Sequence, residues 1–137
     1  MTYEEAYAAL YVKLQAASKK TLQQLFDEMV ELGLKCQRSN CATCLVAEYL
    51  NQDFLPNFNV IVGCDYARLV PVDKHATVSA HLRLPFVLQQ LVYMFDCGAI
   101  PELDAYPYNA RGNELPFGER IRMRFGYDVN SPHTLAS

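Results

Sequence analysis

The pattern of hydrophobic and polar residues in the first third of the chain predicts two helices separated by a short polar break. Thr2 and Thr21 are each followed three residues later by Glu or Gln, which is the capping-box signature of a helix N-terminus. We expect one helix over residues 2–17 and a second that ends at Gly33, and the short link predicts that they form an antiparallel pair. The apolar positions at helical spacing are Tyr3, Tyr7, Leu10, Tyr11 and Leu14 in the first helix, and Leu22, Leu25, Phe26, Met29 and Val30 in the second.

The middle of the chain predicts a short third helix followed by strands. Residues 41–50 fit a helix that has Asn40 as its N-cap. From Phe58 onwards the apolar runs become short and β-branched, which is typical of strands. The expected strands are Phe58–Cys64, Ala67–Val72 after a turn at Asp65 and Tyr66, and Thr77–Leu82.

The segment after these strands predicts the most buried helix of the protein. Residues 86–95 are apolar almost all round, Pro85 suits a first helical turn, and Gly98 marks the end. Farther along, apolar residues alternate with arginines over residues 119–127, which predicts a late strand with one apolar face. The last residues, 128–137, are expected to form a frayed tail.

Together these elements predict an α+β fold. An N-terminal helical hairpin and a short third helix would pack on a small, mostly antiparallel sheet, with one buried helix after the strands. A length of 137 residues suits a single domain, residues 1–137. An apolar content of 51% with 20% charged residues is typical of a globular chain rather than a disordered one.

The charge and composition of the chain disfavour some classes of partner and indicate the cellular compartment. The net charge of −3 and a pI near 5.5 give no general attraction to nucleic acid or to an anionic membrane, so neither is an expected partner. The first ten residues lack the basic and apolar regions of a secretory signal, and no apolar run approaches the ~20 residues of a membrane helix. We therefore expect a cytoplasmic protein, whose five cysteines are thiols or metal ligands.

Three of these cysteines form the most distinctive motif, because Cys36, Cys41 and Cys44 have the spacing C-x4-C-x2-C. Thiolates at such spacing can hold zinc if a fourth ligand completes the site. The candidates for that ligand are Cys64, His75, His81 and Cys97. The spacing also resembles the cluster loop of plant-type [2Fe–2S] ferredoxins, although Arg38, Ser39 and Asn40 stand where that family carries glycine or alanine. Alternatively the cysteines pack in the core and no cofactor is present.

Catalytic motifs are not evident in the sequence. Cys41, Cys64 and Cys97 each lie beside an Asn or Asp and could serve as nucleophiles, but the histidines are scattered and form no recognisable signature with them. There is no glycine-rich phosphate loop, H-E-x-x-H or G-x-S-x-G motif. The sequence leaves open whether the protein is an enzyme and favours a role without catalysis.

Tyrosine and arginine residues in the last third predict a surface that binds another protein. Tyr106 and Tyr108 flank a proline in an irregular segment, and exposed tyrosines are typical of protein-binding surfaces. Arg120, Arg122 and Arg124 would project from the solvent face of the expected late strand. These five residues form the predicted partner-binding set.

Two segments resemble small uncharacterised proteins of actinobacteria and actinophages. Residues 44–50, CLVAEYL, follow a Gly-Leu helix end and are similar to the C-P-x-A-x-Y-L start of that family, with Leu45 in place of its proline. Residues 84–103 are similar to its L-P … F-V-x-x-F-D-x-G-x-x-P-x-L ending. The resemblance covers about residues 21–104 and implies no active site. It implies a phage-encoded or bacterial accessory protein that modulates a host protein by binding, and the alternative hypothesis is a small zinc protein.

Overall fold

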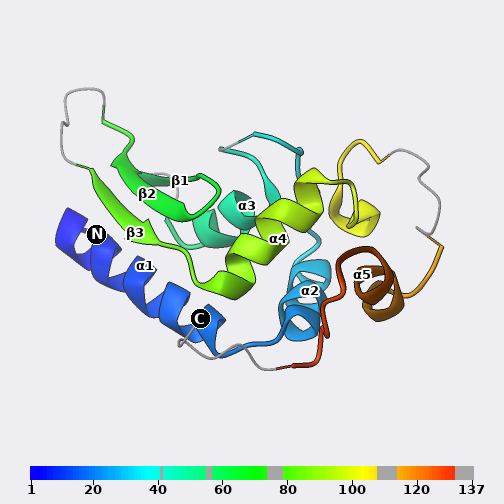
Figure 1. Ribbon diagram of the computed structural model, residues 1–137. Coiled ribbons are helices and arrows are strands. Elements are labelled where there is room, and N and C mark those ends of the chain that lie inside the picture. The colour runs from blue at the N-terminus through cyan, green and yellow to red at the C-terminus, as the bar shows by residue number, and fades with distance from the viewer. Residues whose placement is uncertain (41, 55–56, 74–78, 108–113, 132–137) are drawn as a thin grey trace.

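The computed structural model describes residues 1–40, 42–54, 57–73, 79–107 and 114–131 (Figure 1). Within these residues the elements are α1 (Tyr3–Ser18), α2 (Leu22–Glu31), α3 (Leu45–Asn51), β1 (Phe58–Val62), β2 (Tyr66–Pro71), β3 (Ala80–Arg83), α4 (Phe86–Asp96), the 3-10 helix η1 (Pro101–Leu103) and α5 (Phe117–Phe125). The three strands form one antiparallel sheet in the order β1-β2-β3. The expected α+β fold is therefore confirmed.

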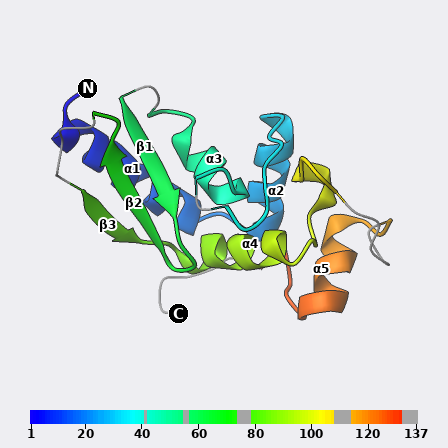
Figure 2. The ribbon, with the colours of Figure 1, turned by 90° about the horizontal axis from the view of Figure 1, so that it is seen from above.

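Helix α4 lies at the centre of the molecule, as predicted. Its buried residues are Val87, Leu88, Gln90, Leu91, Met94 and Phe95. Both α1 and α3 pack against α4, and α3 also packs on β1. Figure 2 shows the sheet at one end of the molecule and α5 at the other, with α4 between them. Helix α4 also carries large apolar side chains on its outer side, because Phe86 and Tyr93 are exposed.

The expected capping boxes are both present at the first two helices. The hydroxyl of Thr2 accepts the backbone N–H of Glu5, and that of Thr21 accepts the N–H of Gln24. Gly33 follows α2 with a φ of 71°, in the left-handed region that glycine adopts at no steric cost. Local capping therefore fixes where these helices begin and end.

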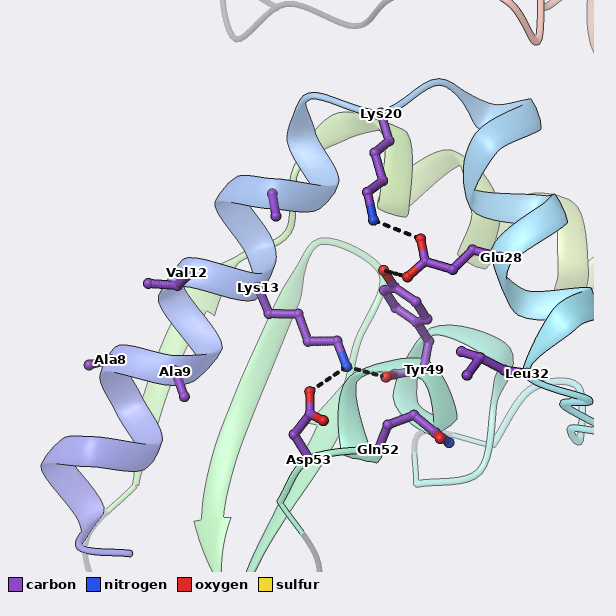
Figure 3. Close-up of a pocket in the computed structure, with 11 residues that line it drawn as sticks. Ala8, Ala9, Val12, Lys13, Lys20, Glu28, Leu32, Tyr49, Gln52 and Asp53 are labelled. Atoms are coloured by element: carbon purple, nitrogen blue, oxygen red, sulfur yellow. Dashed lines mark hydrogen bonds and ion pairs between the residues drawn. The ribbon is translucent and has the colours of Figure 1, made fainter.

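The hairpin formed by α1 and α2 is open. The two helices diverge from their short link, and α3 lies across the space between them (Figure 3). The core face of α1 consists of Ala6, Leu10, Leu14 and Ala17. Tyr7 and Tyr11 were expected on that face and are instead exposed, because the small alanines let α1 approach the core closely while the tyrosine rings extend into solvent.

Helix α3 begins later than predicted, at Leu45, with Cys44 as its N-cap. Asn40 is not the N-cap. Its Oδ1 accepts the backbone N–H groups of Ala42 at 3.0 Å and of Thr43 at 3.2 Å, so it closes a turn ahead of the helix. Cys41 lies outside the described residues.

The first two predicted strands are confirmed, and β1 pairs with β2 from Phe58↔Pro71 to Val62↔Ala67. Of the third predicted strand, residues 77 and 78 lie outside the described residues, and β3 extends one residue past the expected end, to Arg83. Alternate residues of β1 and β2 are buried, which places one face of the sheet on the core.

The prediction of a late strand over residues 119–127 is wrong, because this segment forms α5. Pro116 is the N-cap and Gly126, with a φ of 73°, is the left-handed C-cap. Phe117, Arg120 and Ile121 are buried, which is helical spacing rather than alternation. The apolar period of two that suggested a strand is coincidental, since Met123 points to solvent.

Residues 128–131 were predicted to be frayed, but they are held against the rest of the chain. Val129 is buried, and its carbonyl accepts the backbone N–H of Gln23 at 3.0 Å, which ties this segment to α2. Residues 132–137 lie outside the described residues. None of the helices in the described ranges is long and apolar enough to cross a membrane.

Candidate functional site

The cysteine segment is tied at its start to the chain around Asp104. Cys36 pairs with Asp104 in a parallel bridge, in which the N–H of Cys36 donates to the carbonyl of Leu103 and the N–H of Ala105 donates to the carbonyl of Cys36, both at 2.8 Å. Arg38 adds an ion pair with the buried Asp104, at 2.7 Å between Nε and Oδ2. This segment is therefore held by backbone and side-chain bonds before any ligand is considered.

The thiols of Cys36 and Cys44 are both buried. Burial raises the pKa of the Cys36 thiol to about 12, and the neighbouring Glu48 carboxylate, Cys44 and Asp104 act in the same direction. A catalytic cysteine needs the opposite effect, a lowered pKa that favours the thiolate. The environment of Cys36 therefore suits a core thiol rather than a nucleophile.

The structure brings only part of the proposed zinc site together. Cys44 and Cys64 line one small hollow of about 190 Å³, whereas the exposed His81 packs edge-on against Tyr66. No group of three or more His, Cys, Asp or Glu side chains able to hold a metal occurs among the described residues. Cys41 and His75 lie outside those residues, so the zinc site stays a prediction, which elemental analysis of the purified protein would test.

Alkylation of the native protein should separate the cysteines by exposure. We expect iodoacetamide at about pH 8 to modify the exposed Cys64 at least about tenfold faster than Cys36, because a buried thiol with a raised pKa holds little accessible thiolate. Peptide mass spectrometry over time measures both rates, and a denatured sample is the control in which the difference should vanish. Equal rates in the native protein would contradict a buried Cys36.

The predicted set of partner-binding residues divides in the structure. Tyr106 is exposed, and Arg122 and Arg124 are exposed on α5, but Tyr108 lies outside the described residues. Arg120 was expected on the surface and is only 2% exposed. The reason is the helical geometry of α5, which turns Arg120 inward to where Glu102 provides a charge partner.

Arg120 fastens α5 to the end of α4 and to η1. Its two terminal nitrogens donate to both carboxylate oxygens of Glu102, at 2.9 and 2.7 Å. They also donate to the backbone carbonyls of Ala99, at 3.0 Å, and Leu115, at 2.7 Å. Arg120 is therefore a structural residue, and it positions the outer side of α5.

The outer side of α5 and the neighbouring Tyr93 of α4 form a cluster of aromatic residues, which we call the aromatic face. The Tyr93 ring of α4 meets the Phe125 ring edge-on, with centroids 5.7 Å apart, and Phe125 stacks on Tyr127 at 5.7 Å. The exposed fraction of Tyr93 is 58%. The aromatic face consists of Tyr93, Phe125 and Tyr127 with the neighbouring Arg122 and Arg124.

Arg124 is held over this cluster. Its guanidinium carbon lies 5.4 Å from the centre of the Phe125 ring, and Nη2 donates to the carbonyl of Cys97 at 3.2 Å. A hydrogen bond with Cys97 raises the pKa of Tyr93. The face thus offers aromatic surface, a phenol and a cation side by side.

A second surface feature is the groove between α1, α2 and α3, with a volume of about 740 Å³ (Figure 3). The hydroxyl of Tyr49 donates to Glu28 at 3.0 Å, and Glu28 also pairs with Lys20 at 2.7 Å. Burial, followed by the bond to Glu28, raises the pKa of Tyr49. Lys13 pairs with Asp53 at 2.9 Å, so all four charged residues that line the groove are paired with each other.

Neither surface was predicted in full from the sequence. Tyr93 was assigned to a buried helix, and only the observation that this helix is apolar almost all round could have signalled a second, outward face. The groove depends on the angle between α1 and α2, which no local pattern determines. Comparisons of the chain with protein-family models, with curated protein sequences and with solved structures find no match.

Proposed function

We propose that the protein is a non-enzymatic protein-binding module that recognises its partner with the aromatic face. The observation that carries this proposal is the exposure of Tyr93 beside Phe125, Tyr127 and two arginines. Tyrosine, phenylalanine and arginine are residue types enriched at the centres of protein interfaces. A partner segment with an apolar side chain and a nearby carboxylate fits this surface, because Arg122 and Arg124 can bind a carboxylate.

Binding is favoured over catalysis by the state of the ionisable groups. The pKa values of Cys36 and Tyr49 are both raised, so neither group is activated as a nucleophile. The charged residues of the groove between α1, α2 and α3 are engaged in ion pairs with one another. We further propose that the module acts in the cytoplasm, and the role as a phage-encoded or accessory modulator of a host protein stays a prediction from the resemblance.

Loss of the aromatic face should abolish partner capture. We expect the Tyr93→Ser, Tyr127→Ser double variant to bind its partner at least about 30-fold more weakly than wild type, because two aromatic rings of the face are removed. Affinity purification from host cells, followed by quantitative mass spectrometry, identifies the proteins bound by wild type and lost by the variant. Tyr106→Ser is the matched control, since Tyr106 is equally accessible but is not among the aromatic contacts of this face.

Site-specific photo-crosslinking tests the same surface without weakening it. A photoreactive phenylalanine at position 93 should link the captured partner, and one at the exposed Val72 of the sheet end should not. If the double variant keeps every partner, or if links form at position 72 and not at 93, the aromatic face is not the binding surface.

A further inference from the structure

Helix α1 has an apolar side that nothing in the described chain covers. Its inner side packs on the core, while Ala8, Val12 and Ala16 form an exposed stripe at positions i, i+4 and i+8. Val12 is 64% exposed, and Figure 3 shows Ala8 and Val12 pointing away from the body of the molecule. A surface helix normally places charged or polar residues on that side. The composition of α1 is therefore that of a helix enclosed by two partners.

The groove beside this stripe is shaped for a second helix. Ala9 and Ala16 on the α1 wall are small, and Leu32, which is 47% exposed, stands on the opposite wall. Because the charged residues of the groove pair with each other, an apolar helix can cover it without burying an unpaired charge. Small side chains also let two helix backbones approach closely.

The charges at the ends of α1 indicate which helix fits. Glu4 and Glu5 lie in its first turn, and Lys19 and Lys20 follow its last residue. The stripe is centred on Val12, at the midpoint between the two acids and the two lysines. A copy of α1 that lies antiparallel, with Val12 against Val12, therefore places each acidic end beside a basic end. A parallel copy would place like charges together.

We propose that α1 is the interface of a homodimer, in which α1 of a second copy packs antiparallel along the stripe and groove. A two-fold axis passes beside Val12, Ala8 of each copy faces Ala16 of the other, and Glu4 and Glu5 face Lys19 and Lys20. Such an interface is isologous and closes on itself, as symmetric dimers require. The antiparallel order also opposes the two helix dipoles favourably. This dimer leaves the aromatic face available and does not depend on the proposed function.

The oligomeric state as a function of concentration is the first test. One helix pair is smaller than a standard interface, so we expect a dimer that dissociates at about 10–100 µM in sedimentation velocity of the whole chain. Val12→Glu places two carboxylates on the axis and should raise the dissociation constant more than about tenfold. Met123→Glu, at an exposed residue of α5 at the other end of the molecule (Figure 2), is the control and should leave it unchanged. A chain that stays monomeric to millimolar concentration, or a dimer that Val12→Glu does not weaken, overturns the proposal.

Cysteine cross-linking tests the direction of the helices. In a Cys64→Ser background, which removes an exposed native thiol, Val12→Cys chains should form a disulfide-linked dimer on mild oxidation. Ala8→Cys chains mixed with Ala16→Cys chains should form the mixed dimer, whereas either variant alone should cross-link several-fold less. Preferred links between two copies of position 8 would indicate parallel helices and overturn the antiparallel arrangement. The background protein without an added cysteine measures linkage by the native thiols.

Discussion

Replacement of Arg120 by alanine is expected to lower the free energy of unfolding by about 3–5 kcal/mol. The side chain is 2% exposed and donates to both oxygens of Glu102 and to the carbonyls of Ala99 and Leu115. Alanine removes these bonds, leaves the two carbonyls without this donor and creates a cavity beneath α5. Because a domain of this size has a total stability of about 5–15 kcal/mol, much of it would be lost. Chemical denaturation followed by circular dichroism measures the change.

Two further variants separate the causes of that loss. Arg122→Ala is the matched control on the same helix, and since Arg122 is exposed we expect a change within about 0.5 kcal/mol. Arg120→Met keeps most of the buried volume and removes the hydrogen bonds, so it should fall between the control and the alanine variant. If Arg120→Ala behaved like Arg122→Ala, the ion pair with Glu102 and the hydrogen bonds of Arg120 would contribute nothing measurable to stability.

The parts of the fold that local chemistry specifies were predictable from the sequence. Thr2 and Thr21 specify two helix starts through a hydroxyl and a residue three positions on, and Gly33 specifies a stop. The start of α3 was missed because Asn40 suits a turn as well as a helix cap, and its amide oxygen is used by the turn. Such a choice depends on what the following residues pack against.

The error at α5 has a similar cause. Over residues 119–127 the alternation of apolar and basic residues fitted a strand, and a segment of this length offers too few positions to distinguish periods of 2 and 3.6. The cap residues Pro116 and Gly126 were the decisive signal, since proline before a segment and glycine after it favour a helix. With a helix assumed, the spacing of Phe117, Arg120 and Ile121 would have assigned Arg120 to the core.

The candidate surfaces could be predicted far less than the elements. Tyr93 and Phe125 are distant in sequence and meet only because α5 docks beside the end of α4, which Arg120 fixes through Glu102. Likewise, nothing in the sequence pattern marked Ala8, Val12 and Ala16 of α1 as an exposed stripe. Which side of the helix faces the core became known only from its packing on α4. Both candidate surfaces depend on the angles at which the helices pack, and local sequence patterns do not determine those angles.

Replacement of Asn51 should also lower the free energy of unfolding strongly, because its amide hydrogen-bonds the backbone at the edge of β1 that faces away from β2. Its amide nitrogen donates to the carbonyls of Ala47 and Val60, both at 2.9 Å, and its oxygen accepts the N–H of Val60 at 2.7 Å. Within the described part of the chain, β1 pairs with β2 on one side only, so these backbone groups of Val60 have no described strand beside them. A single amide thus replaces a neighbouring strand and joins α3 to the sheet.

Replacement of Asn51 by leucine, which has nearly the same volume, should therefore lower the free energy of unfolding by about 3 kcal/mol, because a buried N–H and a buried C=O each lose their partner.

Asn51→Asp separates the two roles of the amide, since the carboxylate still accepts from Val60 but faces two carbonyls as a buried charge. Burial and the two facing carbonyls should raise the pKa of that carboxyl, so its charged form destabilises the fold above the unfolded value of about 3.9. The deficit relative to wild type should then shrink as the pH falls towards 4 and grow towards 7, whereas the deficit of Asn51→Leu should not change with pH. Denaturant unfolding at both pH values measures this, with Asn59→Leu on β1 as the control. A leucine variant as stable as wild type, or an aspartate variant whose deficit ignores pH, would show that β1 keeps its outer edge satisfied in some other way.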